Sequence, residues 1–178
     1  MLFRSPELAF EETKTSALVA SELAAWGYKV TTGIAKTGVV AVRRFGDGPS
    51  VAIRADMDAL PIKEQNDVPH ASRRDGCMHA CGHDGHTAML LGAAKALSSR
   101  ADLLGTLILI FQPAEENEGG ALAMLEDGLL ERFPIDEIYG LHNMPGVPLG
   151  TYQVRSGPLL ASFDRFDIEL SRDRKSVV

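Results

Sequence analysis

The chain has 178 residues, 45% hydrophobic and 24% charged, which is typical of one folded domain and excludes an intrinsically disordered chain. The net charge of −6 argues against nucleic acid and anionic membranes as partners, and no apolar run reaches the roughly 18 residues that cross a bilayer. The two cysteines, four residues apart, exclude a disulfide framework and indicate a reducing, cytoplasmic compartment with a metal or redox role.

The first third of the chain predicts a helix followed by three strands. Apolar residues recur at helical spacing from Pro6 to about Trp26, and Gly27 ends the helix. Apolar runs then predict strands over residues 28–30, 38–44 and 51–54, with a turn at 46–49 and a loop at 55–61.

The rest of the chain alternates helices and strands. Asp84 can cap a helix over residues 85–97, and a helix from 119 to about 131 follows later. The continuous apolar run 105–111 is typical of a strand covered on both faces, and a further strand is expected at 135–141. This alternation predicts an α/β sandwich with a central mixed sheet. Residues 163–171 alternate apolar and polar, which predicts a half-buried strand that begins a different sheet.

Three of the five histidines lie within eight residues, around Cys81, in the segment 78–86 (MHACGHDGH). Thiolate and imidazole are preferred ligands of zinc and similar ions. Cys81 and His83 can face one ion because residues i and i+2 of an extended backbone share a side, and Gly82 allows the bend. The segment therefore favours a metal site over a redox-inert thiol in a His-rich turn. For His79 and His86 a supporting role is favoured over ligation.

Further polar groups follow three of the predicted strands. Of Glu115 and Glu116, one can bind a metal while the other accepts a proton from water, although alone they would suit a solvated acidic loop. His142 follows another strand, where a lone histidine is more often structural. Asp56 and Asp58 follow a third, as ligands, orienting groups or turn formers. Because strand ends of an α/β sheet can share one crevice, the motifs together predict a single site.

In combination, these motifs resemble the M20 metallopeptidase family, in its amidohydrolase branch of hippurate hydrolases, N-acyl-amino-acid deacylases and auxin-conjugate hydrolases. The resemblance runs from PELAFEE at residues 6–12 through the motifs at 55–61, 78–86, 112–116 and 140–143 to about residue 171. It implies a zinc-peptidase-like catalytic domain that holds two divalent metal ions, with Mn, Zn, Co and Ni all suited to the ligands.

The resemblance also implies roles for individual residues. The implied metal ligands are Cys81, His83, Glu116 and His142, and the implied general acid/base is Glu115. Asp58 matches the orienting aspartate of the family. Asp56 stands where other branches place a metal-binding histidine, so it is not assigned as a ligand, and Cys77 is assigned no role.

The implied activity is metal-dependent hydrolysis of the amide bond of N-acyl amino acids, hippurate-like or related, by an activated water. A small-molecule substrate is thus the expected partner. Within the family, an aminoacylase, a carboxypeptidase and an N-acetyl-diaminopimelate deacetylase stay open. Outside it, the alternatives are a cysteine hydrolase with Cys81 as nucleophile and a non-catalytic metal-binding fragment.

The resemblance also divides the chain. Residues 6–162 match the N-terminal part of the catalytic domain, and 163–172 match the first strand of a lid or dimerisation domain, which in the full-length form would make a homodimer. The last metal-ligand histidine of the family is not found in the sequence, so we expect the fragment alone to be inactive. Residues 1–5 and 173–178 are expected to be non-native tails, because DNA that can encode 2–5 has a reverse complement that encodes most of 173–176.

Overall fold

The computed structural model describes residues 4–116, 118–160, 166, 168 and 169. The chain divides into two compact units, Met1–Asn143 and Met144–Val178. All helices and strands assigned within the described residues lie in the first unit. In the second unit, residues 144–160 contain turns and bends but no assigned helix or strand, and most of these residues are exposed.

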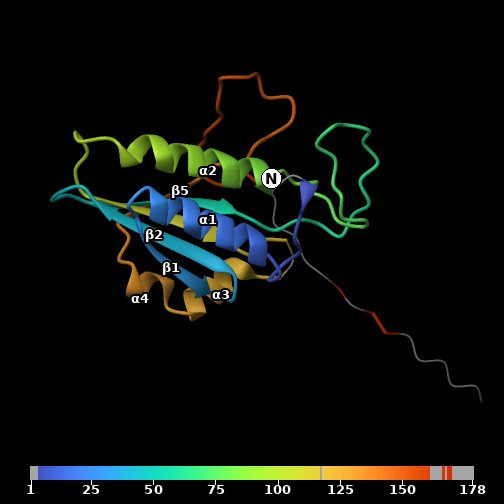
Figure 1. Cartoon of the computed structure of the whole chain (residues 1–178), viewed down its shortest axis with the longest axis horizontal. Coiled ribbons are helices and arrows are strands. Elements are labelled where there is room, and N and C mark those ends of the chain that lie inside the picture. The colour runs from blue at the N-terminus through green and yellow to red at the C-terminus, as the bar shows by residue number, and fades with distance from the viewer. Residues whose placement is uncertain (1–3, 117, 161–165, 167, 170–178) are drawn as a thin grey trace, which may run out of the picture. The chain divides into compact units, whose positions relative to one another are not determined.

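The first unit is built on a mixed five-stranded sheet, as predicted (Figure 1). Its strands are β1 (Lys29–Ile34), β2 (Gly38–Arg44), β3 (Ser50–Asp56), β4 (Thr106–Gln112) and β5 (Glu137–Gly140), in the spatial order β1-β2-β4-β3-β5. Strand β2 is antiparallel to β1 and β4, whereas β3 is parallel to β4 and β5. The carboxyl ends of β3, β4 and β5 therefore lie at one edge of the sheet, where the predicted site residues follow them.

Helices cover both faces of the sheet (Figure 1). They are α1 (Thr13–Ala25), α2 (His83–Ser98), α3 (Gly120–Glu126) and α4 (Leu129–Arg132). Helices α1 and α2 pack with Leu109 and Phe111 in one apolar cluster, and α3 and α4 pack with Ile108 and Ile110 in another. Alternate residues of β4 thus enter opposite clusters, which confirms the prediction of a strand buried on both faces.

Helix α1 begins at Thr13 rather than at Pro6, so the predicted start is wrong. Phe10 has a φ of +59°, which interrupts helical backbone before that point. The side-chain carboxylate of Glu7 accepts hydrogen bonds from the backbone N–H groups of Lys14 at 3.1 Å and Thr15 at 2.8 Å. These are first-turn donors that no helical carbonyl can reach, so Glu7 caps the helix from outside it.

Two other predicted helix features need correction. Helix α2 begins directly after Gly82 and contains Asp84 in its first turn, so Asp84 is not its N-cap. The single helix predicted from 119 to about 131 is two helices, because Gly128 adopts a φ of +78° between them.

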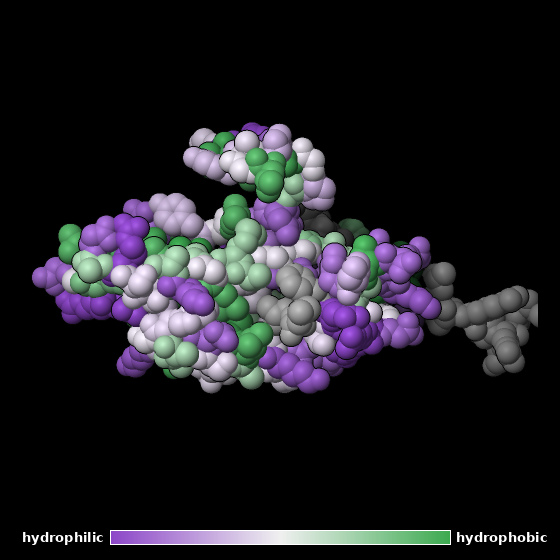
Figure 2. All heavy atoms as spheres, turned by 45° about the horizontal axis from the view of Figure 1, so that its top comes forward, coloured by the Kyte–Doolittle hydropathy of each residue, from purple (hydrophilic) through white to green (hydrophobic). Residues whose placement is uncertain are grey.

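Strands β1 and β3 are longer, and β5 shorter, than the sequence predicts. The predicted strand 163–171 falls largely outside the described residues, as do the expected tail 173–178 and residues 1–3. On the face drawn in Figure 2, hydrophobic residues form small separate groups among hydrophilic ones. No helix in the described part of the chain is long and apolar enough to span a membrane.

Candidate metal centre

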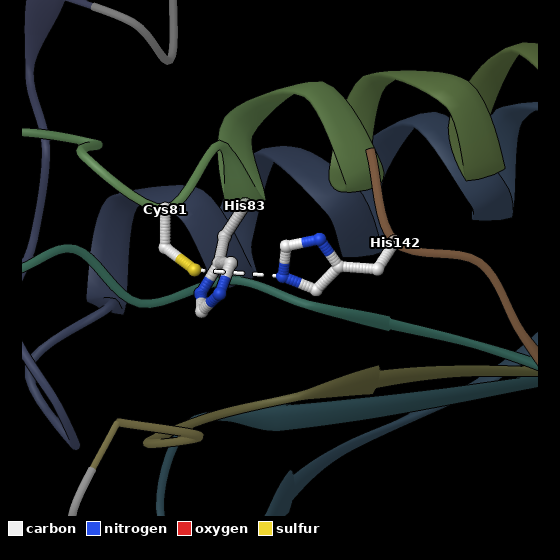
Figure 3. A group of neighbouring side chains, drawn as sticks. All are labelled: Cys81, His83 and His142. Carbon is white, nitrogen blue, oxygen red and sulfur yellow. Dashed lines mark hydrogen bonds between the residues drawn. The ribbon is translucent and has the colours of Figure 1, made fainter. Parts of the chain in front are cut away.

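The predicted site residues meet where β3, β4 and β5 end. His83, the first residue of α2, is fully buried, and its Nε2 lies 3.7 Å from Glu116 Oε1 and 3.9 Å from Glu115 Oε2. Cys81 Sγ lies 3.5 Å from His142 Nε2, and Figure 3 shows both side chains beside the His83 ring. His83 belongs to two groups whose ligand atoms lie within 4.8 Å of one another, one with Cys81 and His142 and one with both glutamates. The structure thus brings all five predicted side chains together.

The loop that carries Cys81 and His83 depends on the glycine between them. Gly82 has a φ of +85°, a left-handed conformation that side chains with a Cβ rarely adopt. A Cβ at Gly82 would also lie 2.5 Å from Asn143 Nδ2. Only glycine therefore lets the loop turn into α2 while it packs against the end of β5.

Asp58 orients both His83 and the loop that carries Glu115 and Glu116. His83 Nδ1–H donates to Asp58 Oδ1 at 3.1 Å, and the backbone N–H of Glu116 donates to Asp58 Oδ2 at 2.9 Å. Burial works to raise the pKa of Asp58, but these hydrogen bonds outweigh it and the pKa is lowered overall. Asp58 therefore stays ionised and fixes the His83 tautomer whose Nε2 carries a lone pair.

The Nε2 atom of His83 is buried and has no hydrogen-bond partner among the described residues. A buried nitrogen without a partner is costly and needs an explanation. His142 is oriented in a similar way, because its Nδ1–H donates to the backbone oxygen of Asn143 at 2.6 Å and its Nε2 faces Cys81. Two imidazole lone pairs, a thiol and two carboxylates around one space form a donor set that fits a divalent cation.

The pKa shifts of three residues in the cluster are also consistent with a cation site. Burial, followed by the nearby carboxylates of Glu116 and Glu115, raises the pKa of Cys81 to about 12. Burial and the charges of Glu116 and Asp56 raise the pKa of Glu115. Burial alone would lower the pKa of His83, but its hydrogen bond to Asp58 and the other carboxylates raise it overall. In all three cases the neighbouring carboxylates raise the pKa, and for Cys81 and Glu115 they add to the larger effect of burial. A bound cation would offset their charge and favour the thiolate form of the cysteine.

A chain of hydrogen bonds links the loop of Cys81 to the loop of His142. His86 Nδ1–H donates to Asp56 Oδ1 at 2.6 Å, and the backbone N–H of Asn143 donates to His86 Nε2 at 2.9 Å. Asn143 Nδ2–H in turn donates to the backbone oxygen of Gly82 at 3.1 Å. Because Gly82 follows Cys81 and Asn143 follows His142, these bonds set the separation of the thiol and the imidazole.

Asp56, His83 and His86 also form a third, wholly buried group with ligand atoms within 4.8 Å. Asp56 and His86 hydrogen-bond each other within this group, and Arg54 Nη1 lies 2.8 Å from Asp56 Oδ2. These contacts favour supporting roles for Asp56 and His86. The sequence singled out the two segments that contain Gly82 and Asn143, but it did not predict the contact between these residues, which lie 61 positions apart.

Replacing Asn143 with alanine is expected to weaken metal binding about 10- to 100-fold, as loss of an outer partner of a ligand does. The variant loses the bond to Gly82 that holds the two loops together. Competition with a chromophoric chelator would measure the affinity. Asn66→Ala, at an exposed asparagine whose side chain contacts Glu64, is the matched control and should bind metal as the wild type does. Equal affinity of the Asn143 variant and this control would contradict the linking role.

Two other residues near Cys81 in the sequence, Cys77 and His79, lie outside the three groups. Cys77 is a buried free thiol whose Sγ lies 3.6 Å from the backbone oxygen of Pro6, and burial raises its pKa. His79 is half-buried, and burial lowers its pKa. Neither contributes to the groups around His83.

Comparison with known proteins shows which family and which proteins the chain is similar to. The sequence model described as peptidase family M20/M25/M40 matches residues 52–178. Hippurate hydrolase of Campylobacter jejuni is 48% identical over 170 residues, which cover 95% of this chain and 44% of that protein. The IAA-amino acid hydrolase ILR1-like 4 of Arabidopsis thaliana is 46% identical over 171 residues, which cover 96% of this chain and 38% of that protein.

Among solved structures, the YXEP protein of Bacillus subtilis, described as a dinuclear metal-binding peptidase from the M20 family, superimposes with a TM-score of 0.83. It is 47% identical, and the match covers 89% of this chain and 44% of that one. The chain thus spans less than half the length of these similar proteins.

Proposed function

The chain belongs to peptidase family M20/M25/M40, and from this premise we propose that the whole protein is a metal-dependent amidohydrolase that cleaves the amide bond of N-acyl amino acids. The observation that carries the proposal is the convergence of a thiol, two imidazoles and two carboxylates around the unpartnered Nε2 of His83. The names of similar proteins, hippurate hydrolase, N-acetylcysteine deacetylase and IAA-amino acid hydrolase, support an N-acyl amino acid as the substrate class.

Cys81, His83, Glu116 and His142 are the residues that would hold two divalent metal ions. Thiolate and imidazole suit Zn, Co and Ni, and the carboxylate also suits Mn. When bound, such ions polarise the amide carbonyl and lower the pKa of a coordinated water. Asp58 contributes by orienting His83 and by holding the backbone of Glu116.

Glu115 is the proposed general acid/base. Its side chain is 41% exposed, compared with 23% for Glu116, so it can reach a water while it lies 3.9 Å from His83 Nε2. Its raised pKa makes its carboxylate a better base than an ordinary glutamate. It would accept a proton from water and deliver it to the leaving amine, which yields a carboxylic acid and a free amino acid.

We also propose how the chain relates to the whole protein. Residues 6–162 would form part of the catalytic domain, and residues 163–172 would begin a lid through which two copies dimerise. The free thiols of Cys77 and Cys81 support a reducing compartment such as the cytoplasm.

The proposal is tested by assaying the whole protein for amino acid release from N-benzoylglycine and a panel of N-acetyl amino acids. Activity is expected to vanish after chelator treatment and to return on addition of Mn²⁺, Zn²⁺, Co²⁺ or Ni²⁺. Hydrolysis that survives the chelator but is lost on thiol alkylation would instead support a cysteine hydrolase. Metal binding without hydrolysis of any substrate would support a non-catalytic role. The preferred substrate would separate the aminoacylase, carboxypeptidase and diaminopimelate deacetylase alternatives.

A further inference from the structure

A buried carboxylate far from the proposed metal ligands in sequence contacts the loop that carries Glu115 and Glu116. Glu12, just before α1, has 0% of its surface exposed. Its Oε1 accepts a hydrogen bond from the backbone N–H of Ala114 at 2.8 Å, and its Oε2 accepts one from Thr37 Oγ1 at 2.5 Å. Burial raises the pKa of Glu12, and these donors offset part of that cost. Glu12 therefore joins three segments that are distant in sequence.

Ala114, which receives this contact, has an unusual backbone. Its φ of +51° is left-handed, which is uncommon for a residue with a Cβ and persists only where the surroundings enforce it. Its N–H is held by Glu12, and its carbonyl oxygen accepts a hydrogen bond from the backbone N–H of Gly120 at 2.9 Å. The next residue is Glu115, so the bend at Ala114 sets the direction in which both glutamates leave β4.

The Glu12 carboxylate is not needed to cap α1. It makes no side-chain capping bond, and the first-turn donors of Lys14 and Thr15 are taken by Glu7. Glu7 and Glu12 are thus two buried carboxylates in one short segment with separate tasks. One stabilises a helix end, and the other reaches across to the end of β4.

We propose that Glu12 is a positioning residue that holds Ala114 in its left-handed conformation and so presents Glu115 and Glu116 to His83. The inference rests on the proposed function, in which Glu115 moves the proton and Glu116 holds metal. The loop is pinned on both sides of Glu115, by Glu12 at Ala114 and by Asp58 at Glu116. Loss of the first anchor would let Ala114 relax to a negative φ and turn Glu115 away.

Variants of Glu12 in the whole protein test this proposal, because one substitution keeps the length of the side chain and another keeps its charge. Gln has the same length, so its oxygen can accept from Ala114 and its amide can donate to Thr37. Asp keeps the charge but is one methylene too short to span both partners. Positioning predicts that kcat falls about 10- to 100-fold in Glu12→Asp and Glu12→Ala, that KM changes little, and that Glu12→Gln stays within about threefold of wild type.

Hydrogen exchange supplies a readout independent of activity. The peptide over residues 112–120 should exchange faster in Glu12→Asp and Glu12→Ala than in wild type or Glu12→Gln. The matched control is Glu7→Ala, which removes the cap of α1 and should lower the melting temperature without changing kcat or this exchange. If Glu12→Ala does not fold, the comparison of Asp with Gln still decides.

The outcomes separate the inference from the function on which it rests. Unchanged exchange in Glu12→Asp, or equal kcat for the Asp and Gln variants, would overturn the positioning role. A wild-type protein without metal-dependent hydrolysis would contradict the proposed function instead. In that case the exchange experiment still shows whether Glu12 holds the loop.

Discussion

Replacement of Glu115 by Gln is expected to reduce kcat for amide hydrolysis by about 10²- to 10⁴-fold, the range that a positioned general acid/base contributes. Gln matches the shape of Glu but cannot accept a proton from water. The metal content should stay at the wild-type value, because the proposed ligands Cys81, His83, Glu116 and His142 are untouched. Steady-state kinetics and elemental analysis of the same preparation would measure both quantities.

An exposed glutamate three positions further along the chain provides the control for this prediction. Glu118 is exposed in the same loop, and Glu118→Gln should leave both kcat and metal content unchanged. If the loop were only a solvated acidic surface, the Glu115 and Glu118 variants would behave alike. If Glu115→Gln lost metal instead of turnover, the roles of Glu115 and Glu116 would have to be exchanged.

The strands were the most predictable part of the fold, because their signals are local. The run that forms β4 is apolar at successive positions, as expected of a strand buried on both faces, and β2 has the predicted bounds. The start of α1 was not predictable from spacing. Residues 6–12 match the helical period, but Leu8 pairs with Ala59 in a parallel bridge and Glu7 caps the helix from a distance.

In the candidate site, too, the local features were predictable and the long-range contacts were not. Cys81 and His83 stand out through their local spacing, and the glutamates and His142 through their position at strand ends. The contacts that arrange these groups are long-range. The hydrogen bond from Ala114 to Glu12 joins residues 102 positions apart. The left-handed backbone conformation occurs at an alanine rather than at a glycine, so the sequence gives no local signal of it. Such contacts follow from the assembled sheet, so a single sequence does not reveal them.

Cys81→Ala is expected to weaken metal binding by more than the roughly 10- to 100-fold that loss of an outer partner costs, because it removes a ligand itself. Burial and the surrounding carboxylates raise the pKa of this thiol to about 12, so a bound cation that offsets those carboxylates is needed for the side chain to act as a thiolate ligand. Elemental analysis should therefore find less metal per chain in the variant.

Cys77→Ala is the matched control, since Cys77 is also a free thiol but lies outside the candidate metal-binding groups. It should retain wild-type metal content, so loss of metal in both variants would point to general damage to the fold. The Cys81 variant also distinguishes the two roles considered for Cys81, nucleophile and metal ligand. A nucleophilic cysteine predicts that Cys81→Ala abolishes turnover while its metal stoichiometry is unchanged, whereas a ligand predicts that metal and turnover are lost together and that excess metal restores part of both.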